Sequence, residues 1–336
     1  MSGSISTRHP EFWSGLPSMA GKTVVITGTT SGTGKAAATT LAGLGAKVVM
    51  LNRPSERATD SFAALSSTHP DAELRSIECD LQSFSSVRAA AARVADVCPD
   101  GVDVLCNNAG VMALGDTATV NGFDVQMQTN HLSHFLLTRE LFPLLTLAAD
   151  AAGEARVVNH SSVARMSPGK TLLPDYLEKK GGQLGGDGSK LQNMMFRGPR
   201  WVRYNQSKLA NAAFTAAMHH RLRENGSKVK ALVAHPGLAQ THLQKTSVTE
   251  GGMGQRFTNL FMRLGQSAED GAMGILSCVC LPDAQSGQFY GPGSGTMALK
   301  GRAEPFALEP FYDNAETRDL LWLKSEAAIG ATFDLS

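Results

Sequence analysis

Apolar residues along this chain form short continuous runs, separated by longer stretches in which apolar and polar positions alternate with helical spacing. Continuous apolar runs are typical of strands buried on both faces, and amphipathic stretches between them predict helices that connect parallel strands. We predict strands at residues 23–27, 47–51, 74–79, 102–106, 156–159, 229–234 and 287–290. We predict helices at residues 33–44, 55–66, 84–97 and 123–145, and one more that ends near residue 223. The alternation predicts one α/β domain on a parallel sheet of about seven strands.

Three segments depart from this alternation. Residues 1–21 are predicted to form an irregular N-terminal arm, so that the single domain covers residues 22–336. Residues 163–203 are rich in glycine and have little periodicity, which predicts an inserted loop. Residues 239–268 begin with polar residues and also contain several glycines, and we expect a substrate lid there. Both segments follow the carboxyl ends of predicted strands, which is the edge of an open parallel sheet where ligands bind.

The composition narrows the class of protein. The 336 residues carry a formal net charge of +1, so nucleic acid is not expected as a partner. No apolar run approaches the length of a membrane span, and the N-terminus lacks the apolar core of a signal peptide. The five cysteines lack Cys-x-x-Cys spacing, which argues against a disulfide framework or a bound metal. We therefore expect an intracellular, cytoplasmic protein without an integral membrane segment.

A glycine-rich turn links the first predicted strand to the first predicted helix. Glycines in such a turn allow a phosphate to approach the backbone, and the helix N-terminus offers N–H groups to it. A nucleoside triphosphate loop is disfavoured, because its first glycine would fall at Thr29 and because Ala36 follows Lys35. In a strand–turn–helix context the turn predicts a dinucleotide site. Its predicted binding residues are Gly28, Thr30, Ser31, Gly32, Thr33 and Gly34.

The end of the second predicted strand bears on the choice of cofactor. A site for NAD(H) usually places an acidic residue there, which binds the 2′-hydroxyl of the ribose. This chain has Asn52 and Arg53 instead, and a guanidinium can bind a 2′-phosphate through two charge-assisted hydrogen bonds. We therefore predict that NADP(H) is preferred over NAD(H), the alternative being that Arg53 is only a solvated surface cation.

Tyr204 and Lys208 are four residues apart in a predicted helix, so their side chains lie on one face. A nearby ammonium favours the phenolate and is expected to lower the pKa of the tyrosine. Such a pair can pass a proton to or from the oxygen of a carbonyl or alcohol. Tyr-x-x-x-Lys arises by chance in many helices, so the motif indicates a function only in combination with the other motifs of the chain.

Together these motifs resemble the short-chain dehydrogenase/reductase family, over roughly residues 21 to 291. The resemblance is carried, in family order, by Thr27-Gly28-x-x-x-Gly32-x-Gly34, Asp80-Leu81, Asn107-Asn108-Ala109-Gly110, Asn130, Ser161-Ser162, Tyr204-x-x-x-Lys208 and Pro236-Gly237. The segments around Tyr204 and Trp322 are similar to the retinol dehydrogenases and WW-domain oxidoreductases, and that branch is also similar to protochlorophyllide reductases. The resemblance implies a Rossmann-like, doubly wound sheet, and homo-oligomers are common in the family.

The resemblance also implies a role for each matching residue. Tyr204 would be the general acid in reduction, Lys208 would hold the nicotinamide ribose and lower the pKa of Tyr204, and Ser162, with Ser161 as its alternative, would bind the substrate oxygen. Asn130 would hold a water that connects Lys208 to solvent, unless it only satisfies local backbone groups. The remaining cofactor contacts would come from Asp80, Leu81, Asn108, Ala109, Gly110, Pro236, Gly237 and Thr241.

The chain departs from the family pattern at two places. Thr33 replaces a residue that is usually apolar, and the interval from Ser162 to Tyr204 is unusually long. His131, His134, His219 and His220 lack acidic or cysteine neighbours at metal spacing, which favours packing or surface roles. We expect an NADPH-dependent reductase of a lipophilic aldehyde or ketone, such as a retinoid or another isoprenoid. The alternatives are a reductase of a carbon–carbon double bond in a large pigment and an NADP-binding sensor or scaffold with little turnover.

Overall fold

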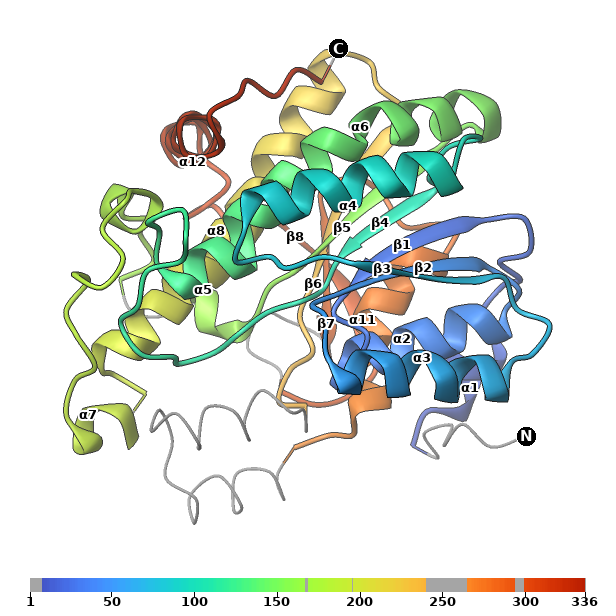
Figure 1. The fold of residues 1–336 in the computed structure, drawn as a ribbon, viewed down its shortest axis with the longest axis horizontal. Coiled ribbons are helices and arrows are strands. Elements are labelled where there is room, and N and C mark those ends of the chain that lie inside the picture. Colours follow the sequence, from blue (N-terminus) through green and yellow to red (C-terminus); the bar gives the residue numbers. More distant parts are fainter. Residues whose placement is uncertain (1–7, 167–168, 195, 240–264, 294–298, 336) are drawn as a thin grey trace.

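A computed structural model describes residues 8–166, 169–194, 196–239, 265–293 and 299–335. The described chain forms one eight-stranded sheet in the order β3-β2-β1-β4-β5-β6-β7-β8 (Figure 1). Its strands are β1 (Thr23–Thr27), β2 (Lys47–Asn52), β3 (Leu74–Glu78), β4 (Val104–Asn107), β5 (Ala155–His160), β6 (Val229–Ala234), β7 (Gln288–Pro292) and β8 (Ala303–Ala307). All neighbouring strands are parallel except β7 and β8. The predicted doubly wound α/β domain is confirmed.

Helices cover both faces of the sheet (Figure 1). The longer helices are α2 (Gly32–Gly43), α3 (Glu56–Thr68), α4 (Phe84–Val97), α6 (Ser133–Ala152), α8 (Pro199–Glu224), α11 (Ala268–Cys280) and α12 (Ala315–Ile329). Successive strand residues point to opposite faces, so Val24 and Ile26 pack with α2 and α11, whereas Val25 packs with α4, α6 and α8. Two hydrophobic cores result, and every residue of β1 after Thr23 is buried.

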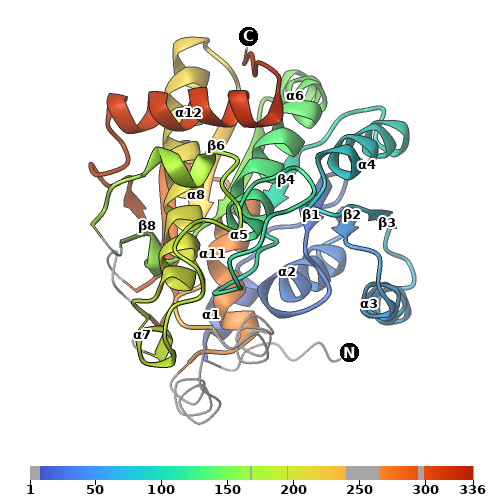
Figure 2. The ribbon, with the colours of Figure 1, turned by 60° about the vertical axis from the view of Figure 1, so that its left-hand side comes forward.

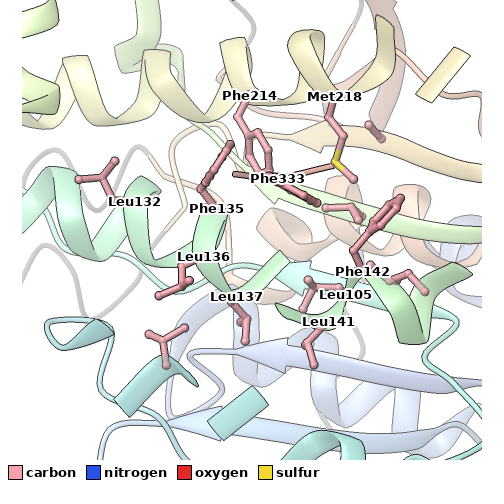
Figure 3. Packing of buried hydrophobic residues seen from close by; sticks show 14 of the residues in the cluster. Leu105, Leu132, Phe135, Leu136, Leu137, Leu141, Phe142, Phe214, Met218 and Phe333 are labelled. Carbon is pink, nitrogen blue, oxygen red and sulfur yellow. The ribbon is translucent and has the colours of Figure 1, made fainter. Parts of the chain in front are cut away.

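The C-terminal part of the domain was not predicted. The eighth strand, β8, pairs antiparallel with β7 at the edge of the sheet, where its Pro305 is tolerated. Only Ala303 of β8 is buried, and the strand sequence Ala-Glu-Pro-Phe-Ala contains no continuous apolar run of the kind that identified the other strands. Helix α12 crosses α8 (Figure 2). Phe333 lies with Phe135 of α6 and Phe214 of α8 in one aromatic cluster (Figure 3), and the ring of Trp322 contacts all three. This cluster closes the core on that face of the sheet.

Three predicted segments differ in detail. The N-terminal arm contains a short helix, α1 (Pro10–Ser14), and buries Phe12, because this apolar side chain packs into the core beside α2. The predicted helix at 123–145 is three pieces: α5 (Val125–Met127), a π-helical turn η1 (Gln128–Leu132), and α6. The predicted loop at 163–203 contains the 3₁₀ turns η2 (Val163–Met166) and η3 (Pro174–Leu177), helix α7 (Lys190–Met194), and the first turn of α8.

Candidate active site

A cavity of about 560 Å³ lies at the carboxyl ends of the central strands. The order of the strands reverses at β1, which has β2 on one side and β4 on the other, and this switch point is where open α/β sheets bind ligands. Sixteen of the predicted residues line the cavity: Gly28, Thr30, Ser31, Gly32, Thr33, Gly34, Asn52, Arg53, Asp80, Leu81, Asn108, Ala109, Gly110, Tyr204, Lys208 and Pro236. Asn130, Ser162 and Gly237 do not line it, and Thr241 lies outside the described residues.

The glycine turn is closely packed against the segment that follows β4. Gly28 has a φ of 73°, and a Cβ atom there would lie 2.8 Å from the Cα of Ala109. A Cβ at Gly34 would lie 2.2 Å from the carbonyl oxygen of Gly28. Both positions therefore require glycine, and the turn then leads into α2 at Ser31, whose side chain does not cap the helix. The first N–H groups of α2 lie beside the cavity and can bind an anion.

Asn108 connects this turn to β4 and β5. Its side-chain amide donates hydrogen bonds to the carbonyl oxygens of Thr27 and Gly28, at 2.9 and 3.1 Å. Its side-chain oxygen accepts from the Nδ1 of His160, at 3.0 Å, and from the hydroxyl of Thr33, at 3.3 Å. The hydroxyl at position 33, which departs from the family pattern, is therefore used in packing the floor of the cavity.

The two predicted cofactor-binding residues at the end of β2 make different contacts. Asn52 accepts a hydrogen bond from the N–H of Thr29 and donates one to its hydroxyl, both at 2.8 Å, so it holds the glycine turn. Arg53 is exposed and lines the cavity. Arg57, in the first turn of α3, also lines it and was not predicted. Arg57 lies four residues after Arg53, and this second cation close to the end of β2 was the signal that could have identified it.

Tyr204 and Lys208 both line the cavity from α8 and are both buried. The Lys208 ammonium lies 5.9 Å from the centre of the Tyr204 ring and donates a hydrogen bond to the carbonyl oxygen of His160, at 3.0 Å. Burial lowers the pKa of Lys208 to about 8. Burial raises the pKa of Tyr204 to about 12, and a hydrogen bond with Ser162 acts in the opposite direction. The net shift of the tyrosine pKa is therefore opposite to the expected one in the protein alone, because burial outweighs the hydrogen bond that lowers it.

The two neighbouring serines have separate partners. The Ser161 hydroxyl is buried and donates to the carbonyl oxygen of Lys208, at 2.6 Å. Ser162 hydrogen-bonds the side chain of Tyr204. Strand alternation predicted that only one of the two would serve the reaction, and the structure brings Ser162 to the tyrosine.

Asn130 lies in the π-helical turn η1. Its side chain pairs with the backbone of Val111, accepting from the N–H at 2.7 Å and donating to the carbonyl oxygen at 2.9 Å. It also donates to the hydroxyl of Ser207, at 2.8 Å. Its own carbonyl oxygen is 3.0 Å from Nδ1 of His134. The side chain thus fixes the segment that follows β4, and both of its N–H donors have partners.

The predicted nicotinamide end is only partly described. Gly237 has a φ of 60°, and a Cβ there would lie 2.4 Å from the carbonyl oxygen of Leu299. The carbonyl oxygen of Pro236 accepts a hydrogen bond from Gln266, at 2.8 Å. These contacts hold the loop after β6 against the C-terminal segment.

An apolar cluster beside Tyr204 was not predicted. Met112, Ala113 and Trp201 are buried with Tyr204, and Phe196 packs against them. The rings of Trp201 and Tyr204 meet edge to face, 6.0 Å apart, and so do those of Phe196 and Trp201, 4.6 Å apart. Ala113 and Phe196 both adopt positive φ, a strained backbone conformation that clusters at functional sites.

Several groups lie outside the candidate chemistry. His131 hydrogen-bonds Ser325 at 2.8 Å, and His134 hydrogen-bonds Thr27 at 2.9 Å, so the predicted packing roles are confirmed. All five cysteines are buried and unpaired. In the part of the chain that the structure describes, no cluster of three His, Cys, Asp or Glu side chains could hold a metal. Among these same residues, none of the helices combines the length and apolar character needed to cross a membrane.

Comparison with known proteins agrees with this geometry. The short chain dehydrogenase family model matches residues 22–182. Mouse retinol dehydrogenase 14 is 33% identical over 285 residues, which is 81% of this chain and 78% of that protein. The chloroplastic short-chain dehydrogenase TIC 32 A of Brassica napus is 33% identical over 67% of this chain, but the match spans 66% of its own length. The match to human retinol dehydrogenase 13 spans 60% of the length of that protein.

Among solved structures, an uncharacterised protein from Mycobacterium paratuberculosis is 34% identical, with a TM-score of 0.69 over 96% of this chain and 98% of that one. The chain belongs to the short-chain dehydrogenase/reductase family, in the branch that resembles the retinol dehydrogenases.

Proposed function

We propose that this protein is an NADP(H)-dependent oxidoreductase that reduces the carbonyl group of a lipophilic aldehyde or ketone, and that can also oxidise the corresponding alcohol. The observation that carries the proposal is that Tyr204 and Lys208 line one cavity together with the N-terminus of α2, and that Ser162 hydrogen-bonds Tyr204. An elongated dinucleotide suits a cavity with an anion site at one end and proton-donating groups at the other.

The residues of the chain would divide the work as follows. The bound nicotinamide supplies the hydride. Ser162 and Tyr204 orient the carbonyl oxygen by hydrogen bonding, and Tyr204 donates its proton to that oxygen. Lys208 would hold ribose hydroxyls, and its ammonium, 5.9 Å from the centre of the Tyr204 ring, would bring positive charge near the phenol as the proton leaves. Tyr204 and Lys208 are buried and Ser162 is half-buried, which limits the access of water to the reacting atoms.

The preference for NADP(H) rests on two cations at the adenosine end of the cavity. Arg53 and Arg57 both line it, and β2 ends without an acidic residue. Replacing Arg53 with Ala is expected to weaken NADPH binding by about tenfold to a hundredfold, the value of a charge-assisted hydrogen bond. NADH binding should change little, since it carries no 2′-phosphate. Fluorescence titration with both cofactors checks this, and equal weakening of both would contradict the assignment.

The lipophilic substrate class rests on the cluster of Met112, Trp201 and Phe196 beside Tyr204. A polar carbonyl compound would find few partners on this side of the tyrosine. A panel of aldehydes and ketones, followed by nicotinamide absorbance, tests the class. Tight NADPH binding with light-dependent turnover of a pigment would favour the double-bond reductase instead, and binding with no turnover would favour a sensor.

The central test is the variant Tyr204→Phe, which removes the proton donor and keeps the ring. Turnover is expected to fall by about a hundredfold or more, because general acid catalysis contributes factors of this size. NADPH affinity should be retained, since the ring still packs on Trp201. An unchanged rate would contradict the proposed chemistry.

A further inference from the structure

Arg165 is one of the largest fully buried side chains of the described chain, and the proposed reaction does not use it. It lies in η2, three residues after Ser162. One guanidinium nitrogen, Nη1, donates a hydrogen bond to the carbonyl oxygen of Ser162, at 3.0 Å. The other two nitrogens, Nε and Nη2, bind the two carboxylate oxygens of Glu309 at 2.7 and 2.9 Å. The arginine thus connects the serine turn to a residue 144 positions later.

Other contacts leave this guanidinium little freedom. Its carbon lies 4.3 Å from the centre of the Phe289 ring in β7. Besides Glu309, the charged or titratable groups around it are His235, whose pKa burial and the arginine lower to about 3, and Tyr312, which is fully buried beside Glu309. His235 is therefore neutral, and the carboxylate of Glu309 is the counter-charge of Arg165. A bidentate pair of this kind holds its donor in one orientation.

The Ser162 turn is also held by its backbone, since the N–H of Arg165 donates to the carbonyl oxygen of Ser162, at 3.1 Å, and the N–H of Ser161 donates to that of Ala234, at 2.8 Å. The Arg165 guanidinium is a second donor to the same Ser162 oxygen. The Ser162 hydroxyl accepts a hydrogen bond from the N–H of Ala164, at 3.2 Å, and bonds the Tyr204 side chain. The carbonyl oxygen of the same residue is the group that Arg165 holds. A shift of the turn would therefore move the Ser162 hydroxyl relative to the tyrosine.

We propose that Arg165, held by Glu309, is a positioning residue of the active site, which keeps the Ser162 hydroxyl against Tyr204. This inference rests on the proposed function, in which the Ser162 hydroxyl orients the carbonyl oxygen of the substrate. It makes the segment between β8 and α12 part of the catalytic support, although that segment lies far from Ser162 in sequence. A buried ion pair is seldom needed for stability, because apolar residues of similar volume often replace it without loss.

The test is the double variant Arg165→Met with Glu309→Leu, which replaces both partners and leaves no unpaired buried charge. It is expected to fold and to bind NADPH with wild-type affinity, since neither residue lines the cavity. Its kcat should fall by about tenfold to a hundredfold, the usual result of a small misplacement of a catalytic group. The KM for the carbonyl should change less than kcat. The pH at which the rate of alcohol oxidation rises should be higher than in the wild-type protein. The reason is that the Ser162 hydrogen bond, which the variant disturbs, lowers the pKa of Tyr204.

The matched control is Arg156→Met with Glu154→Leu, at the opposite end of β5. Arg156 is also buried, pairs with Glu154, and donates to the carbonyl oxygens of Cys278 and Leu281. Loss of thermal stability without a change in kcat or in the pH profile is expected for this control.

If the Arg165 double variant behaves like this control, the positioning role is wrong and the pair is only structural. Absence of turnover in the wild-type protein would instead overturn the proposed function. A crystal structure of the double variant would then still decide the inference: a Ser162 hydroxyl displaced from Tyr204 supports it, and an unmoved one contradicts it.

Discussion

At the scale of single residues, burial changes the chemistry of the candidate site more than sequence spacing predicts. Lys208 and Tyr204 have the predicted spacing on α8 and both line the cavity. Burial disfavours the charged form of each, so the pKa of the lysine falls to about 8 and that of the tyrosine rises to about 12. The site is therefore built from groups whose charged states are costly because the side chains are buried.

The cost of burying the charged Lys208 ammonium predicts how the free energy of unfolding depends on pH. The pKa of Lys208 in the folded protein is below its value in the unfolded chain, so the folded protein bears the full penalty below about pH 8 and loses it as the pH rises towards the ordinary lysine pKa of 10.5. Lys208→Met has no such penalty and should be more stable than wild type at pH 7, by at most about 3 kcal/mol. Urea denaturation of both proteins without cofactor, from pH 7 to 10.5, measures the difference. A gap that does not narrow with pH would contradict the buried-charge explanation.

At the scale of secondary-structure elements, the segment between Ser162 and Tyr204 is an ordered part of the fold where the structure describes it. The carboxylate of Asp116 accepts hydrogen bonds from the N–H groups of Gly182, Leu184 and Gly186, at 3.1, 2.8 and 2.8 Å. Arg203, in the first turns of α8, is fully buried and donates to the carbonyl oxygens of Leu184, Gly186 and Leu114. Asp116 and Arg203 therefore attach the inserted segment to the loop after β4.

Arg203→Met should release this attachment. The variant leaves Asp124, which pairs with Arg203 at 3.3 Å, as an unpaired buried acid, and breaking such a pair costs about 3–5 kcal/mol. Amides at 182–186 are expected to exchange with deuterium faster than in the wild-type protein. The amides of the central strands are expected to keep the same ranking of exchange rates. The control is Lys180→Met, which removes an exposed ion pair with Asp175 in the same segment. Equal exchange at 182–186 in both variants would contradict the anchoring role.

At the scale of the whole molecule, the C-terminal helix completes the core under α6 and α8. Trp322 packs on Phe135 at 5.1 Å between ring centres and stacks on Phe333 at 5.2 Å. The next residue, Leu323, is 66% exposed. The two adjacent apolar residues thus lie on different sides of α12, one packed on the core and the other in water.

Trp322→Ala should cost about 3–5 kcal/mol of unfolding free energy, the usual effect of removing a buried tryptophan. Leu323→Ala should change it by less than about 0.5 kcal/mol, because the side chain is mostly in water. Denaturant unfolding of the two variants checks the contrast. Similar losses at both positions would mean that α12 does not pack on the core as described.

The sequence alone predicted the features that depend on local pattern. Apolar runs identified seven of the eight strands of the sheet, since a strand buried on both faces is continuously apolar. Motif spacing placed the glycine turn, Tyr204 and Lys208 at the same sheet edge, because the carboxyl ends of parallel strands meet there. Strand β8 and the π-helical turn at Asn130 lack such a pattern and were not predicted.

Only the tertiary structure decided which distant groups meet. No periodicity in the sequence connects Arg165 with Glu309, or Asp116 with the amides of 182–186, because these contacts depend on how loops are folded over the sheet. The same holds for the pKa of Tyr204, whose direction is determined by the burial of the phenol and not by its spacing from Lys208. Residue types and spacings thus determined which chemistry this chain can carry, and packing decided how those residues are held and charged.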